Sequence, residues 1–361
     1  MKAYLLLFLI LFIGVGVLIF SSFTPEVKQE ASFEYVKEKQ VYADTPVRKN
    51  EKTTKIDEEK SENVQLKDRL KIVANQYEKN MQYPPYSQPL SKKQFNLLNP
   101  NIFRTIQMKL DPNRDIKASL KLNAFRIFQG EAIEINITLA SPVQSNGFDL
   151  EKIELFSKQK LVAEITFSKD KVNENTKYFS ASYSPSSDES ETWAQELFIK
   201  ASFHDEQNKK YVIASSFKYI PAQAELSDVK QAYVNANELV IPLELKVYSD
   251  GRYLVKANVF TKEGTPIAHV YAKKNIEKGK GELLLKVHAS TLRLKNAEGP
   301  YVLKDFTIVK VITSVVAKKG YGLSLKSEYE VNGFSLDTYS TEPYHNKAQE
   351  QKLEFLKKIS S

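Results

Sequence analysis

The sequence predicts an all-β protein, with two tandem antiparallel β-sandwiches behind an N-terminal transmembrane helix and a partly helical tether. Three observations predict this class. The chain begins with an uncharged apolar run, continues with a Lys- and Glu-rich stretch, and then repeats apolar residues at every second position. The expected parts are an anchor at 1–23, a tether at 24–115, sandwiches at 116–221 and 222–341, and a C-terminal short helix or tail at 342–361.

The segment Ala3–Phe23 carries no charge and is preceded by Lys2. As a helix it spans about 30 Å, the hydrocarbon thickness of a bilayer, so residues 3–23 are expected to contact lipid. A cleaved signal peptide is the alternative, but it needs a shorter apolar core and a small-x-small site, and here Pro25 follows the candidate cut. The positive N-terminus favours a cytoplasmic start, which places the following domains in the periplasm or outside the cell.

The chain contains no cysteine, which excludes disulfides, thiol catalysis and a lipidated cysteine. Eukaryotic extracellular sandwiches usually carry disulfides, so this composition favours a single-pass protein of the bacterial inner membrane. The net charge is +8, but basic and acidic residues are interspersed along the chain. We therefore expect a solvated surface and no nucleic-acid partner.

The tether has two features of its own. A helix is expected at 58–80, where Leu66, Leu70, Val73 and Tyr77 form a narrow apolar stripe. It is either a marginal helix of the tether or a dimerising or docking helix. The Pro-rich segment 83–89 favours polyproline II and is expected to be a stiff spacer, although such a segment can also dock on an aromatic groove.

The first sandwich is predicted from short strands with period two. In 131–140, Ile133, Ile135 and Ile137 alternate with polar residues, as in a strand with one buried face. Further strands are expected at 152–156, 161–167, 177–183, 193–204 and 211–219. Trp193 is expected to anchor the core and not to serve as a sugar-stacking platform.

After an expected joint at Pro221–Ala224, a second strand series follows, with alternation in 239–247, 253–259 and 283–287. Gly251-Arg252-Tyr253 and Gly299-Pro300-Tyr301 each place a tyrosine just past a turn. There the ring can pack and the hydroxyl can bond back to the backbone. Over residues 239–311 the sequence resembles an immunoglobulin-like (fibronectin-like) module of exported bacterial proteins. The resemblance implies the fold and an exported context, and it implies no reaction.

The sequence predicts no catalytic, metal-binding or cofactor-binding residue. The histidines have no metal-ligand spacing and are expected to be ordinary strand or loop residues. They are His204, His269, His288 and His345. The acidic loop at Asp188, Glu189 and Glu191 matches no calcium loop. Lys278–Gly281 precedes a strand and is expected to be a turn and not a phosphate-binding loop. The segment around Ser324 lacks the second glycine of a nucleophile elbow. Asn136 matches the glycosylation sequence pattern but lies inside an expected strand.

These observations predict a binding, interaction or structural module whose partner is another envelope protein or a surface glycan. The alternative is an enzyme or accessory subunit with a site in the inter-domain groove. A histidine facing a carboxylate there would favour the enzyme, and an exposed aromatic patch or a long unpaired edge strand would favour binding. A short C-terminal helix at 345–359 is expected to cover a sandwich edge or to make a second contact.

Overall fold

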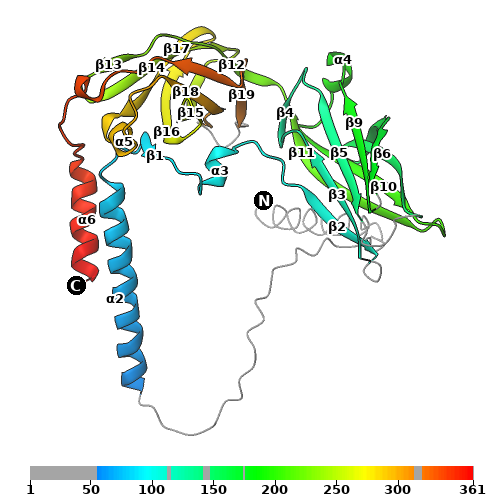
Figure 1. Cartoon of the computed structure of the whole chain (residues 1–361), viewed down its shortest axis with the longest axis horizontal. Helices are drawn as coiled ribbons and strands as arrows, with labels where there is room; N and C mark the ends of the chain where they lie inside the picture. The colour runs from blue at the N-terminus through cyan, green and yellow to red at the C-terminus, as the bar shows by residue number, and fades with distance from the viewer. Residues whose placement is uncertain (1–54, 112–114, 141–146, 174, 313–318, 361) are drawn as a thin grey trace, which may run out of the picture. The chain divides into compact units, whose positions relative to one another are not determined.

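The computed structural model describes residues 55–111, 115–140, 147–173, 175–312 and 319–360 (Figure 1). Lys60–Ser361 form one unit of the chain and Met1–Glu59 another. In the described ranges, strands gathered into sheets predominate over helices. The predicted all-β class is therefore confirmed.

Two five-stranded sheets share one core. In the first, the strand order is β2, β3, β5, β9, β8, with bounds Ile106–Asp111, Ile116–Leu122, Ile133–Ala140, Thr176–Tyr183 and Ser168–Asn173. In the second, it is β4, β11, β10, β6, β7, with bounds Arg126–Phe128, Lys210–Ile220, Glu196–His204, Asp149–Ser157 and Lys160–Ile165. A short helix, α4 (Ser187–Ser190), precedes β10. Alternate residues such as Ile135, Leu155 and Phe217 face inward and are fully buried.

A ten-stranded sheet surrounds a second core. Its main path is β1, β16, β15, β18, β19, β12, β14, β13, with bounds Ser87–Pro89, Pro266–Ile276, Gly251–Thr261, Tyr301–Lys310, Gly320–Ser324, Ala222–Val229, Glu238–Val247 and Tyr233–Asn235. Two more strands, β17 (Gly279–His288) and β20 (Glu328–Val331), pair with β14 and β18. The short helices are α3 (Phe95–Leu98), α5 (Ala289–Leu294) and the 3₁₀ turn η1 (Leu336–Thr338).

The two tyrosines that follow glycine turns are buried as the sequence predicts. The hydroxyl of Tyr253 donates to the carbonyl of Ser249 at 2.6 Å, and that of Tyr301 donates to the carbonyl of Ala297 at 2.9 Å. Each ring thereby fills the core while its polar end satisfies the backbone of the preceding turn.

The expected joint at Pro221–Ala224 is shorter than predicted. Strand β11 ends at Ile220 and β12 begins at Ala222, so Pro221 alone separates them. Proline lacks a donor and interrupts the ladder there. The sequence did not indicate β12 because two of its four apolar residues are alanines, and only Ala224 and Leu226 are buried.

The Pro-rich segment is part of the sheet and not a stiff spacer. Ser87–Pro89 form β1, an antiparallel edge strand on β16. Ser87 is fully buried, and the hydroxyl of Tyr86 donates to the carboxylate of Glu238. An edge strand tolerates proline because one side of its backbone needs no partner, which is why the prolines did not exclude pairing.

Helices α2 (Lys55–Asn80) and α6 (Lys347–Ser360) lie side by side (Figure 1). Glu78 forms a 2.8 Å ion pair with Lys357, and the Lys352 ammonium lies 5.5 Å from the Tyr77 ring centroid. Ala74 is buried while Leu66 and Val73 of the predicted stripe are exposed. The C-terminal helix was expected to cover a sandwich edge or to make a second contact. No residue of α6 is buried, and both of these contacts join it to α2.

The predicted anchor at 1–23 and the tether up to residue 54 lie outside the described residues. Among the helices that are described, none is both long enough and apolar enough to span a membrane.

Candidate ligand-binding site

The four histidines lie in separate places. His204 ends β10, and His345 is exposed, with its Nδ1 3.4 Å from a Glu350 oxygen. His269 is half-buried in β16, and His288 is buried where β17 ends and α5 begins. Across the described ranges, no three side chains of His, Cys, Asp or Glu gather as a metal site requires.

The other residues noted in the sequence have structural settings. Ser186 and Glu189 form a capping box at α4, so the acidic loop around Asp188 begins a short helix. The Ser324 hydroxyl, at the end of β19, donates to a backbone carbonyl at 2.7 Å. Lys278 precedes β17 directly, as expected of a turn. Asn136 lies within β5.

His288 connects three remote segments. Its backbone N–H donates to the Ser87 hydroxyl at 3.0 Å, its Nδ1 accepts from the Ser290 N–H at 3.2 Å as the N-cap of α5, and its ring meets that of Tyr344 edge-on. Burial lowers the pKa of His288 below its ordinary value, Arg293 lowers it further, and Glu238 acts in the opposite direction. The folded state therefore favours the neutral imidazole.

The stability of the folded chain is expected to fall as the pH drops below about 6.5. In that window the unfolded His288 binds a proton, and the folded one, whose pKa is lowered, does not. The loss of stability due to His288 ends once the pH is below the pKa that this residue has in the folded state. Urea unfolding midpoints between about pH 5 and pH 7.5 measure this dependence.

His288→Asn is the matched control, because asparagine caps a helix without titrating. Its unfolding midpoint is expected to change less with pH than that of the wild type. An identical pH dependence in the two proteins would show that proton uptake by His288 does not contribute.

A polar cluster on the outer face of the ten-stranded sheet combines an asparagine with a histidine and an aspartate. Asn258 of β15 pairs across the ladder with His269 of β16, whose Nδ1 lies 2.7 Å from Asn258 Oδ1. Asn258 Nδ2 donates to the Leu97 carbonyl at 2.7 Å and to Asp305 Oδ2 at 3.0 Å. Asn258 is 0% exposed although it faces away from the core, because the α3 segment covers it.

A β-bulge brings Asp305 to this cluster. The register between β15 and β18 shifts between Lys256 and Asn258, and Asp305 adopts a positive φ of 59°. Aspartate tolerates this left-handed conformation better than most residues. The extra residue places the Asp305 carboxylate within reach of Asn258.

Burial shifts both titratable groups of the cluster toward neutrality. It raises the pKa of Asp305, against the Asn258 hydrogen bond and Lys304, which lower it. It lowers the pKa of His269, as does Lys256 nearby. Since Asn258 Oδ1 can only accept, His269 Nδ1 carries the proton of the neutral ring, which leaves Nε2 as a free base.

A cavity of about 580 Å³ opens beside the cluster. Its lining includes three cations, Arg126, Lys256 and Lys319, and one carboxyl group, Asp305. Among the residues described, no carboxylate forms an ion pair with any of these cations. The cavity therefore favours an anion.

Tyr321 of β19 lies at the centre of the basic residues. The Arg126 guanidinium carbon is 5.0 Å from its ring centroid, and the ammonium groups of Lys319 and Lys218 are 5.3 and 5.9 Å away. Arg126 also donates to the Pro100 carbonyl at 3.0 Å. Burial lowers the pKa of Arg126, but a guanidinium stays charged in proteins.

Two further cavities, of about 330 and 300 Å³, also include Tyr321 in their lining. The first adds Arg252, Lys310 and the carboxylate of Asp250, and the second adds the carboxylate of Glu131. We call the three hollows around Tyr321 the basic groove. Because its cations outnumber its carboxylates over three adjoining hollows, the groove suits a ligand with several anionic groups.

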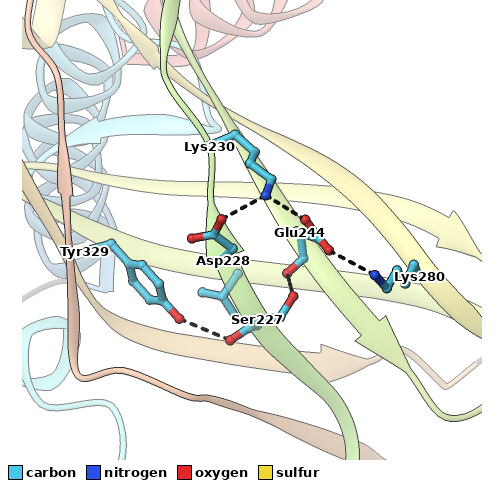
Figure 2. Close-up of polar contacts among 7 residues, drawn as sticks. Ser227, Asp228, Lys230, Glu244, Lys280 and Tyr329 are labelled. Carbon is cyan, nitrogen blue, oxygen red and sulfur yellow. Dashed lines mark hydrogen bonds and ion pairs between the residues drawn. The ribbon is translucent and has the colours of Figure 1, made fainter.

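Other charges on the same sheet are already paired (Figure 2). Lys230 bonds to Asp228 at 2.8 Å and to Glu244 at 2.9 Å, and Lys280 lies 3.9 Å from Glu244. These groups are solvent-exposed and satisfy one another, so they stabilise little and leave no net charge for a ligand. The cations that line the largest hollow of the basic groove have, by contrast, no such carboxylate partner among the residues described.

The sequence did not indicate Arg126, Tyr321 and Asp305, the first of which is distant in sequence from the other two. One signal was present. The apolar phase of β18 changes from Tyr301 and Leu303 to Phe306 and Ile308, which indicates a bulge at the intervening residues.

A family profile described as the C-terminal domain of a domain of unknown function, DUF4785, matches residues 223–316. The match covers the region 239–311 that resembles an exported module, and it extends over less than half of the chain. No curated protein matches this sequence.

Several solved structures are similar to the chain at low identity. One, a DUF4785 family protein from Legionella pneumophila, has 14% identity and a TM-score of 0.38, over 54% of this chain and 53% of that chain. A conserved domain protein from Bacillus anthracis has 9% identity and a TM-score of 0.24, over 63% and 83%. A cycloalternan-forming enzyme from Listeria monocytogenes has 13% identity and a TM-score of 0.25, over 54% and 21%. The chain spans about half the length of the Legionella protein.

Proposed function

We propose that this protein is a membrane-anchored binding module of the bacterial envelope and that its partner is a polyanionic surface glycan. Residues 3–23 hold it in the inner membrane. Two Ig-like sandwiches, at 116–221 and 222–341, are displayed in the periplasm or outside the cell. The basic groove around Tyr321 receives the glycan.

The observation that carries this proposal is the set of cations without carboxylate partners beside an aromatic ring. Arg126 and Lys319 both lie over Tyr321, and Lys256 faces the adjoining cavity. A guanidinium and ammonium groups bind carboxylates, sulfates and phosphates, and a tyrosine ring offers a sugar an apolar face with a polar edge. A charged polysaccharide presents both features along one chain.

Binding of polygalacturonate, a polymer of carboxylated sugars, by the full-length protein tests the proposal. Calorimetry is expected to detect binding at about 0.1 M salt and to find it much weaker at about 1 M, because the Debye length falls from about 10 Å to about 3 Å. Neutral dextran is expected not to bind at the groove. Arg126→Gln should weaken polygalacturonate binding about 10-fold or more, since a charged hydrogen bond is lost.

Lys274→Gln is the matched control, because it removes one exposed charge of β16 away from the groove. Equal affinities of the Arg126 and Lys274 variants would contradict the proposed site. If the protein binds an envelope protein and binds no anionic polysaccharide, the partner is a protein and not a glycan.

One observation favours an enzyme as a second candidate. His269 and Asp305 both contact Asn258, and burial shifts both pKa values toward the neutral forms. His269 Nε2 could then act as a general base and Asp305 as a general acid. Turnover of an anionic glycan that is lost in His269→Gln, with binding retained, would favour this function.

A further inference from the structure

A separate cavity of about 650 Å³ lies in the paired five-stranded sheets. One wall is the β6–β7 hairpin, and the other is the segment after α4, which contains Trp193. A volume of this size is typical of ligand pockets. The cavity is built from one pair of sheets and shares no lining residue with the basic groove.

Trp193, which the sequence predicts as a core anchor, packs against the edge of the core. Strand β10 begins three residues later, at Glu196, and the indole is half-buried. Its ring packs against Tyr219 with centroids 5.8 Å apart, and Tyr219 is itself in the core. The indole is therefore held firmly on the core side while it also lines the cavity.

Polar groups around the indole are available to a ligand. Among the described residues, no acceptor binds the Trp193 indole N–H, and no partner binds the side chains of Thr192 and Gln159, which line the same cavity. Leu161, which is 45% exposed, adds an apolar surface. The lining also contains Lys158, Lys160 and Glu189, and Glu189 already accepts hydrogen bonds from Tyr183 and Ser186. Exposed donors and acceptors thus lie beside an aromatic ring that packs on the core.

We propose that this cavity is a binding site for a neutral saccharide. A pyranose ring has one face of C–H groups, which pack on an aromatic ring, and an edge of hydroxyls, which need donors and acceptors. Trp193 and Leu161 offer the apolar contact, and Thr192, Gln159 and the indole N–H offer the hydrogen bonds. The site is separate from the basic groove, so it does not depend on the proposed anionic ligand.

The single tryptophan makes the test specific, because all tryptophan fluorescence comes from this cavity. The full-length protein, in a detergent without a sugar headgroup, is titrated with maltohexaose and with chitohexaose. For at least one of them we expect a saturable change in emission, protection of Trp193 from iodide quenching, and a dissociation constant of about 1 mM or tighter.

Thr192→Ala and Gln159→Ala keep the fluorescent residue and remove one polar contact each. Each is expected to weaken saccharide binding about 5-fold, the effect of one lost hydrogen bond. Thr265→Ala, at an exposed turn residue that lines neither this cavity nor the basic groove, is the matched control and should leave the affinity unchanged.

The proposal is overturned if neither oligosaccharide changes the emission or the iodide quenching of the folded wild-type protein. It is also overturned if the Thr192, Gln159 and Thr265 variants bind with equal affinity. Binding of polygalacturonate at the basic groove is measured separately by calorimetry, so failure of one proposal leaves the other distinguishable.

Discussion

Replacing Tyr253 with alanine is expected to destabilise the ten-stranded sheet by about 3–5 kcal/mol. The ring is 0% exposed, and its removal leaves a cavity at the centre of the core. Its hydroxyl also serves the carbonyls of Ser249 and Gln223, at 2.6 and 3.2 Å. Urea unfolding measures the loss, and hydrogen exchange of β15 locates it.

Tyr253→Phe separates the two contributions, because it keeps the ring and removes the hydroxyl. It is expected to cost about 1–2 kcal/mol. Tyr271→Ala, on the outer face of β16, is the control and should cost less than about 1 kcal/mol. Equal losses for Tyr253→Ala and Tyr271→Ala would mean that the buried tyrosine is not an anchor of this core.

The second large effect is expected from Asn258→Leu, which should cost about 3 kcal/mol. Leucine has a similar volume but no polar group, so the Leu97 carbonyl, the Asp305 carboxyl group and His269 Nδ1 each lose a partner. A buried polar group without a hydrogen bond costs about 1–3 kcal/mol. Unfolding measurements give the total loss.

Hydrogen exchange of the α3 segment is a second measurement on Asn258→Leu. Exchange there is expected to accelerate, because the Leu97 carbonyl is the group through which Asn258 holds the segment. Asn275→Leu, at an exposed position of β16, should change neither quantity. Unchanged exchange in the Asn258 variant would show that other contacts hold α3.

The strands with clear alternation were predictable because each buries a single face. In β5, Ile133, Ile135 and Ile137 follow the period of the pleat, and the structure buries all three. The positions of Tyr253 and Tyr301 after glycine turns also predicted that their hydroxyls bond to the backbone, as the structure shows. Such features depend on residues near in sequence.

Strands in which apolar and polar residues do not alternate were not predicted, because their pairing depends on residues that are distant in sequence. The edge strands β8 and β1 contain mostly polar residues or a proline, and neighbouring strands decide that they pair. Trp193 packs on the edge of the core and is only half-buried, because β10 starts later than its apolar pattern suggested. An element boundary is set by tertiary hydrogen bonds as much as by local preference.

The sequence by itself determined the all-β class and the main strands, because apolar periodicity is a local property of the chain. Tertiary structure alone decided the candidate sites. Arg126 is far in sequence from Asp305 and Tyr321, and the three come together only through sheet pairing and a bulge. The interspersed charges of the sequence thus gather around one ring, because a fold joins residues by contact and not by their order.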